Sequence, residues 1–125
     1  MNLQQIEELT TTQNGSTVEA WKTRVLELCK KGGVSMVEVS RMEGATGEST
    51  LWGDENQTVV IWMDLHANLT RAISELIEER RLAVRITSPM IYLMDGGTLK
   101  LPIAKKANKS YKTPHWAPVV LALAA

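Results

Sequence analysis

Residues 58–81 read TVVIWMDLHANLTRAISELIEERR, and this stretch decides the fold class. Thr58–Trp62 is a continuous β-branched and aromatic run, which predicts a buried strand. Asp64 is expected to cap the helix that follows. This helix ends near Arg80-Arg81 and carries the apolar stripe of a core-packed helix. The stripe consists of Leu65, Leu69, Ala72, Ile73, Leu76 and Ile77.

Upstream, residues 16–31 predict a second long helix. Ser16 and Glu19 have the spacing of a capping box, and Gly32-Gly33 ends the helix. Four apolar side chains recur at helical spacing and form one stripe, namely Val18, Trp21, Val25 and Leu28.

Residues 34–42 allow two interpretations. Ser35 with Glu38 predicts a short capped helix, whereas the alternation of valines with polar residues suits a strand equally well. We favour the helix. The glycine-rich stretch 44–56 predicts a loop, and Trp52 is expected to pin that loop to the core.

Downstream, residues 82–101 predict two strands and a hairpin. Leu82–Ile86 and Met90–Met94 are apolar runs of strand length. Asp95-Gly96 is a two-residue turn signal, and Thr98–Leu101 would return as the partner strand. The expected fold is therefore α+β, with two main helices packed on a small, mostly antiparallel sheet that includes this hairpin.

The chain has 125 residues, which is enough for one domain. Residues 1–15 predict a short helix and a polar linker, and residues 16–104 form the main body. Residues 105–125 are a basic segment followed by an apolar tail. That tail is expected to pair as a last strand or to bury against a partner subunit.

Charge is balanced overall but uneven along the chain. There are 14 basic and 14 acidic side chains, which excludes a uniformly basic coat for nucleic acid. The first 60 residues carry five basic and nine acidic side chains, and the remainder carries nine basic and five acidic ones. Such asymmetry can mark an interaction surface.

The single cysteine excludes an internal disulfide framework and favours a cytoplasmic location. No apolar run approaches the roughly 20 residues that span a bilayer, so no membrane partner is expected.

The strand TVVIW, the helix DLHANLTRAISELIEERRL and the segment LAVRITSPMIYLMDGGTLKL resemble the second half of a winged-helix DNA-binding domain. The resemblance covers residues 17–104. It implies that the helix over 64–81 enters the major groove of duplex DNA. It also implies that the hairpin is a wing, which touches the backbone or the minor groove.

This resemblance implies DNA-contacting roles for two sets of side chains. The base-reading candidates lie on the exposed part of the 64–81 helix and are His66, Asn68, Thr70 and Arg71. The phosphate-contact candidates are basic side chains of the wing and the tail, which would supply most of the affinity. They are Arg85, Lys100, Lys105, Lys106, Lys109 and Lys112.

The leading hypothesis is a small regulatory DNA-binding module of bacterial, phage or mobile-element origin. A homodimer is expected, because one small module has modest affinity and the apolar C-terminus could be buried between two copies. The alternative is a protein–protein interaction module, an adaptor or an inhibitor. Its interface would be the acidic first half of the chain or the edge of the hairpin.

Catalysis is not expected from these residues. His66 and His115 lack further ligands at the spacing of a metal site, since zinc needs three or four. Cys29 falls on the apolar side of its helix and is predicted to be a small buried residue. We therefore expect no enzyme activity, no metal and no cofactor.

Overall fold

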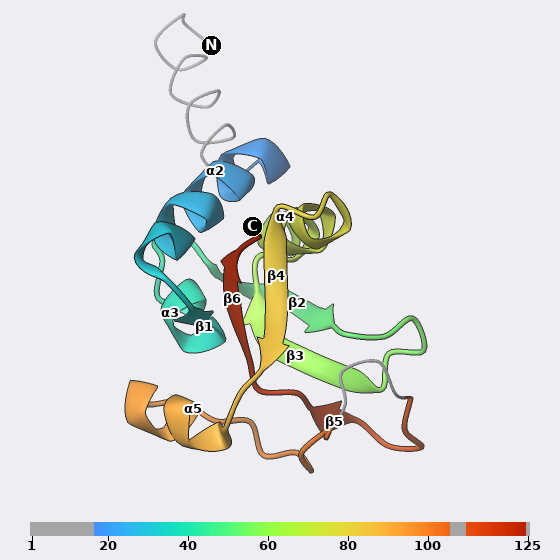
Figure 1. The fold of residues 1–125 in the computed structure, drawn as a ribbon. Helices are drawn as coiled ribbons and strands as arrows, with labels where there is room; N and C mark the ends of the chain where they lie inside the picture. The colour runs from blue at the N-terminus through green and yellow to red at the C-terminus, as the bar shows by residue number, and fades with distance from the viewer. Residues whose placement is uncertain (1–16, 106–109, 125) are drawn as a thin grey trace, which may run out of the picture.

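The computed structural model describes residues 17–105 and 110–124, in which helices and strands are mixed along the chain (Figure 1). The helices described are α2 (Val18–Leu28), α3 (Met36–Ser40), α4 (Ala67–Glu78) and α5 (Pro89–Asp95), with a 3₁₀ turn, η1 (Cys29–Lys31), after α2. The strands are β1 (Val34–Ser35), β2 (Thr46–Trp52), β3 (Val59–Leu65), β4 (Leu82–Ile86), β5 (His115–Trp116) and β6 (Val119–Leu123). The fold is α+β, which confirms the predicted class.

The first sheet has the strand order β1-β6-β4, and both pairings are antiparallel. Its central strand is the last one in the sequence. Leu121 of β6 pairs with Val34 on one side and with Val84 on the other. Val119 and Leu121 are fully buried. The apolar tail thus forms a last strand, and these side chains are not free to bury against a second copy.

The second sheet has the order β2-β3-β5. β2 and β3 pair antiparallel with an irregular register, and β5 runs parallel to β3. Gly47 lies where β2 passes the end of β3. A Cβ atom at Gly47 would come within 2.6 Å of the Leu65 carbonyl oxygen, so only glycine allows this approach.

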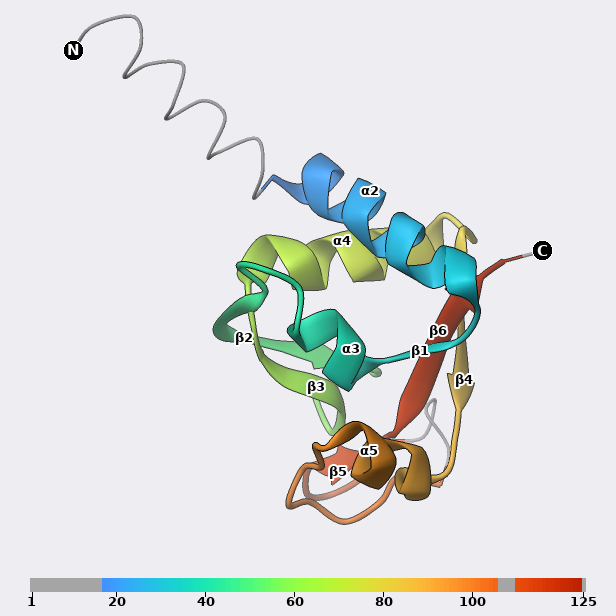
Figure 2. The same cartoon turned by 90° about the vertical axis from the view of Figure 1, so that its left-hand side faces the viewer.

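The buried core is one cluster, and two regions of it lie toward opposite ends of the molecule. At one end α2 lies along α4, and α5 is at the other end (Figure 2). Trp21 of α2 and Ile73 of α4 are buried in the first region. The second region is a ring cluster in which Tyr92 of α5 lies 5.3 Å from Trp62 and 5.0 Å from Trp116, between ring centroids.

The hydroxyl of Tyr92 joins α5 to the rest of the fold. It accepts a hydrogen bond from the Met36 backbone N–H at 2.9 Å and donates one to the Val119 carbonyl at 2.6 Å. Burial raises the pKa of Tyr92 to about 12, so the hydroxyl keeps its proton for the second bond.

The N-termini of the two long helices differ from the predicted caps. Asp64 does not cap α4: it lies within β3 with a φ of 59°. The cap is His66, whose Nδ1 accepts a hydrogen bond from the Asn68 backbone N–H. The cap of α2 is Thr17, and the expected Ser16 lies outside the described residues. The strand extends to Leu65 because pairing with β2 continues that far.

Both interpretations of residues 34–42 prove partly right, because β1 is followed at once by α3. The predicted capping box is present: the Ser35 hydroxyl accepts from the Glu38 N–H, and the Glu38 carboxylate accepts from the Ser35 N–H.

The predicted loop over 44–56 is wrong. Most of its central part is β2, because pairing with β3 outweighs its polar and glycine-rich composition.

The predicted hairpin over 90–101 is also wrong. Residues 89–95 are the helix α5, which begins at a Ser88 cap with Pro89 in its first turn and ends at Gly96 with a φ of 93°. A short apolar run suits either a strand or a helix, and these end signals favour the helix. Asp95-Gly96 is therefore a helix end. The strand paired with β4 is β6, and the expected strand over 98–101 is absent.

Replacing Tyr92 with Phe is expected to lower the free energy of unfolding by about 1–3 kcal/mol, because two buried backbone groups lose their partner. Urea unfolding followed by circular dichroism measures the change. Thr98→Val is the control, since it also removes a hydroxyl but from an exposed side chain. Equal stability of Tyr92→Phe and Thr98→Val would contradict this role of the hydroxyl.

Candidate functional site

The four base-reading candidates lie at the start of α4, and each of them has a partner within the protein. His66 caps the helix, and its ring lies 5.9 Å from that of Trp21, tilted by 42°. The Thr70 hydroxyl donates to the Ala67 carbonyl at 2.7 Å. Nε of Arg71 donates to a Glu75 carboxylate oxygen at 2.8 Å. Asn68 is half-buried beside them.

A cluster of acidic side chains surrounds a buried lysine on the neighbouring helix. Nζ of Lys22 lies 3.0 Å from carboxylate oxygens of both Glu75 and Glu79, and 3.5 Å from one of Glu19. Hydrogen bonds to Glu79 and Glu75 raise the pKa of Lys22. Its ammonium, with help from Arg71, lowers the pKa of Glu75. These charges join α2 to α4.

The outward surface of α4 is consequently more acidic than basic. Arg71 is the one cation of this helix and is paired with Glu75, whereas Glu78 is exposed. A phosphate backbone brought close to this surface would meet unfavourable charge.

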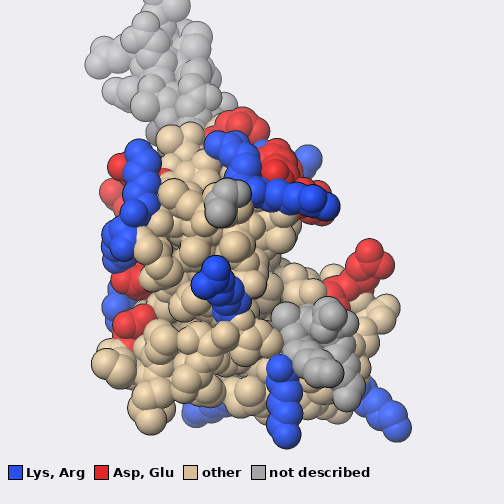
Figure 3. All heavy atoms as spheres, in the orientation of Figure 1, with Lys and Arg blue, Asp and Glu red and all other residues tan. Residues whose placement is uncertain are grey.

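The phosphate-contact candidates come from other parts of the chain. Arg85 is on β4, Lys100 and Lys105 lie in the segment after α5, and Lys112 lies before β5. All four are exposed. Lys106 and Lys109 lie outside the described residues. On the face in Figure 3, basic side chains alternate with acidic ones at the upper end and stand apart from one another at the lower end.

A surface that the sequence reasoning missed is formed by α5. Four large apolar side chains of this helix are exposed, with 59% of Met90, 60% of Leu93 and 81% of Met94 accessible, together with Ile91. We call these four residues the α5 surface. Ser88-Pro89 and Gly96 were the signals that could have identified a helix here, and hence a surface that differs from a hairpin edge.

The side of α5 opposite this surface is attached to the rest of the fold. Tyr92 is buried in the ring cluster, and the Ser35 hydroxyl donates to the Asp95 carboxylate at 2.6 Å. The Arg41 guanidinium donates to the Asp95 carbonyl at the end of the helix. The one acidic side chain of α5 is thus occupied within the protein.

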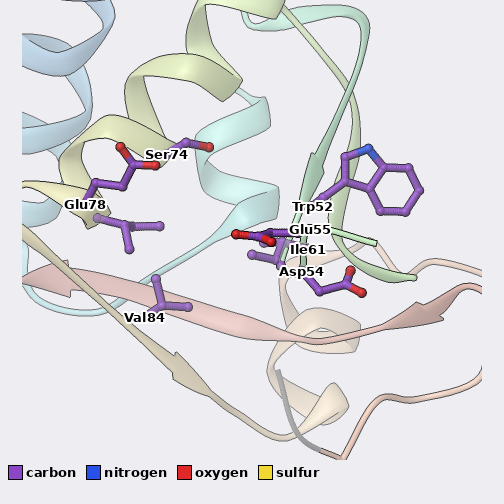
Figure 4. Close-up of a pocket in the computed structure, with 9 residues that line it drawn as sticks. Trp52, Asp54, Glu55, Ile61, Ser74, Glu78 and Val84 are labelled. Carbon is purple, nitrogen blue, oxygen red and sulfur yellow. The ribbon is translucent and has the colours of Figure 1, made fainter. Parts of the chain in front are cut away.

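A cleft of about 430 Å³ lies between α4, β4 and the turn from β2 to β3 (Figure 4). Its lining is mainly apolar. The lining residues are Trp52, Gly53, Asp54, Glu55, Ile61, Ser74, Ile77, Glu78 and Val84.

Asp54 organises the turn at the edge of this cleft. Its carboxylate accepts hydrogen bonds from the backbone N–H groups of Thr58 and Val59, and from the hydroxyls of Thr58 and Ser110. Burial would raise the pKa of Asp54, but the Thr58 hydroxyl and the other hydrogen bonds outweigh burial and lower it. This carboxylate is therefore structural.

Other sites considered from the sequence have no support in the described structure. Cys29 is buried, as predicted, and burial raises the pKa of its thiol. No group of three or more histidine, cysteine, aspartate or glutamate side chains is arranged to hold a metal ion within residues 17–105 and 110–124. None of the helices described has the length and apolar character needed to cross a membrane.

Neither protein-family models, nor curated proteins, nor solved structures include a match to this chain.

The pKa of Glu75 predicts acid sensitivity. Because its pKa is lower in the folded protein, the stability it contributes is present above about pH 4.3 and is lost as the pH falls through the folded value. Glu75→Gln is expected to destabilise the protein at pH 7 and to reduce the loss between pH 7 and 3. Urea unfolding at both pH values measures this.

Glu27→Gln is the matched control, because Glu27 forms an exposed ion pair with Lys30. An exposed pair contributes little to stability. If the two variants change equally between pH 7 and 3, the Lys22 cluster does not have the stabilising role assigned to it.

Proposed function

We propose that this protein is a non-catalytic protein-interaction module that binds its partner through the α5 surface. The observation that carries the proposal is the exposure of four large apolar side chains on one short helix. Contiguous apolar surface in a folded protein marks interaction sites, because leaving it in water is unfavourable. Methionine and leucine also adapt well to a partner's shape.

The anchoring of α5 supports the same conclusion. Tyr92 and Asp95 accept hydrogen bonds from α3 and β1, and Tyr92 donates one to β6, so the helix does not have to form on binding. A preformed surface loses less conformational entropy when it binds, and more of the contact energy remains as affinity.

The charged residues that flank α5 in the sequence indicate the partner's chemistry. Residues 82–105 contain three basic side chains, Arg85, Lys100 and Lys105, and a single acidic one, Asp95. The Asp95 carboxylate accepts a hydrogen bond from Ser35. A second copy would bring the same basic side chains together, which is unfavourable. The surface therefore fits a protein segment with apolar anchors flanked by aspartate or glutamate.

A second candidate function is DNA binding, and the order of the elements favours it. α2, β1, α3, α4, β4 and β6 follow one another as helix, strand, two helices and two strands, and the three strands form one antiparallel sheet. This order is similar to that of a winged-helix domain. The β2–β3 pair is then an insertion before α4, and α5 with β5 occupies the place of the wing.

The two candidates make different demands on the surface. The acidic side chains around α4 oppose DNA binding by that helix, whereas the single acidic side chain of α5, Asp95, already accepts a hydrogen bond from Ser35. For this reason the protein-interaction module is our main proposal.

A labelled, designed amphipathic helix with leucine anchors and glutamate flanks tests the main proposal by fluorescence anisotropy. We expect the acidic helix to bind at least about tenfold more tightly than the same helix with lysine flanks. Leu93→Glu and Met94→Glu should each abolish this binding, since they place a charge at the centre of the contact.

Leu123→Glu is the matched control, because Leu123 is also an exposed apolar residue but lies at the other end of the molecule from α5. It should bind the acidic helix like the natural protein. Equal binding of the two helices would contradict the proposed partner chemistry. A homodimer that dissociates on Met94→Glu would assign the α5 surface to a second copy instead.

DNA binding makes a separate prediction. If α4 reads bases, affinity for random duplex DNA should fall steeply between about 50 and 200 mM salt, because phosphate contacts release counterions. Arg71→Ala and Lys105→Glu should both weaken it. A gel shift measures this, and absence of binding at low salt with tens of micromolar protein would exclude the DNA candidate.

A further inference from the structure

The cleft between α4, β4 and the β2–β3 turn lies apart from the α5 surface and has no role in the proposed interaction. Its volume of about 430 Å³ falls within the range of small-molecule sites. The apolar side chains that line the cleft come from different elements of the fold: Ile77 from α4, Ile61 from β3 and Val84 from β4. A ligand here would contact both sheets and the helix at once.

The polar groups of the cleft are few and are placed on opposite sides. Ser74 and Glu78 project from α4, and the carboxylate of Glu55 points from the turn toward that helix (Figure 4). The Trp52 ring and the Asp54 carboxylate point the other way. The interior is therefore bounded by apolar side chains, one hydroxyl and two carboxylates.

Within the part of the chain that the structure describes, these polar groups are available to a ligand. Across the described ranges, Glu55 and Glu78 form no ion pair, and Ser74 makes no side-chain hydrogen bond. Among the residues that the structure describes, no lysine or arginine lines the cleft. The apolar walls would hold an apolar body, and the two carboxylates would favour a positive charge at its end.

We propose that this cleft binds a small organic cation, an alkyl- or arylammonium group with an apolar body. The apolar part lies against Ile61, Ile77 and Val84, and the ammonium lies between Glu55 and Glu78, within reach of the Ser74 hydroxyl. A simple anion or a neutral hydrocarbon would leave one half of this arrangement unused.

The test uses phenethylammonium as the probe and 2-phenylethanol as its neutral counterpart. Amide chemical shifts of the ¹⁵N-labelled full chain report where each probe binds. We expect the ammonium to shift residues of α4, β4 and the β2–β3 turn, and to bind about fivefold more tightly than the alcohol. N-acetyl-lysine amide serves as a further probe, because it presents a lysine side chain. Comparing its binding with that of phenethylammonium distinguishes a site for a partner's lysine from a site for a small amine.

The double variant Glu55→Gln with Glu78→Gln should remove the preference for the ammonium probe, while the shape of the cleft is retained. Glu43→Gln with Glu48→Gln is the matched control, since it changes the net charge equally at exposed positions outside the cleft. Equal binding of the two probes, shifts confined to other regions, or no binding at about 10 mM would each overturn the proposal.

Discussion

Backbone hydrogen bonds from β6 to both β1 and β4 hold the first sheet together, because β6 is the only strand in the described chain that pairs with either. Val34 lies near one end of the described chain, and Leu121 lies near the other. The sheet therefore forms only after a large loop has been closed, at a cost in chain entropy. Burial of Val34, Val119 and Leu121 offsets that cost.

The central position of β6 also determines where the α5 surface lies. The chain leaves β4, forms α5 and β5, and returns as β6, so the intervening segment must pack against the end of the sheet. Tyr92 makes that attachment through Met36 and Val119. With its inner side fixed in this way, α5 presents its remaining apolar side chains to solvent.

The two ends of the molecule differ in the side chains that they present at the surface. Lys22 pairs with Glu75 and Glu79 at the junction of α2 and α4, and acidic and basic side chains alternate at this end (Figure 3). The segment around α5 combines apolar side chains with basic ones. A net charge of zero thus conceals a difference between an end of mixed charge and an end that combines apolar with basic side chains.

Local patterns were sufficient for the elements with strong periodicity or clear end signals. The apolar stripe from Leu69 to Leu76 identified α4, and the spacing of Ser35 and Glu38 identified the cap of α3. These patterns depend on neighbours three or four residues away, so a sequence contains all the information they need. Thr58–Trp62 and Leu82–Ile86 were likewise recognisable as strands.

Elements that depend on distant partners could not be identified in that way. β2 is a strand because β3 pairs with it, and residues 89–95 are a short apolar run that suits a strand or a helix. The sequence also supplied the types of candidate site residues, but not their partners: Arg71 is paired with Glu75. Only the tertiary structure decided which apolar side chains remain exposed on α5, because exposure depends on contacts with residues far away in the sequence.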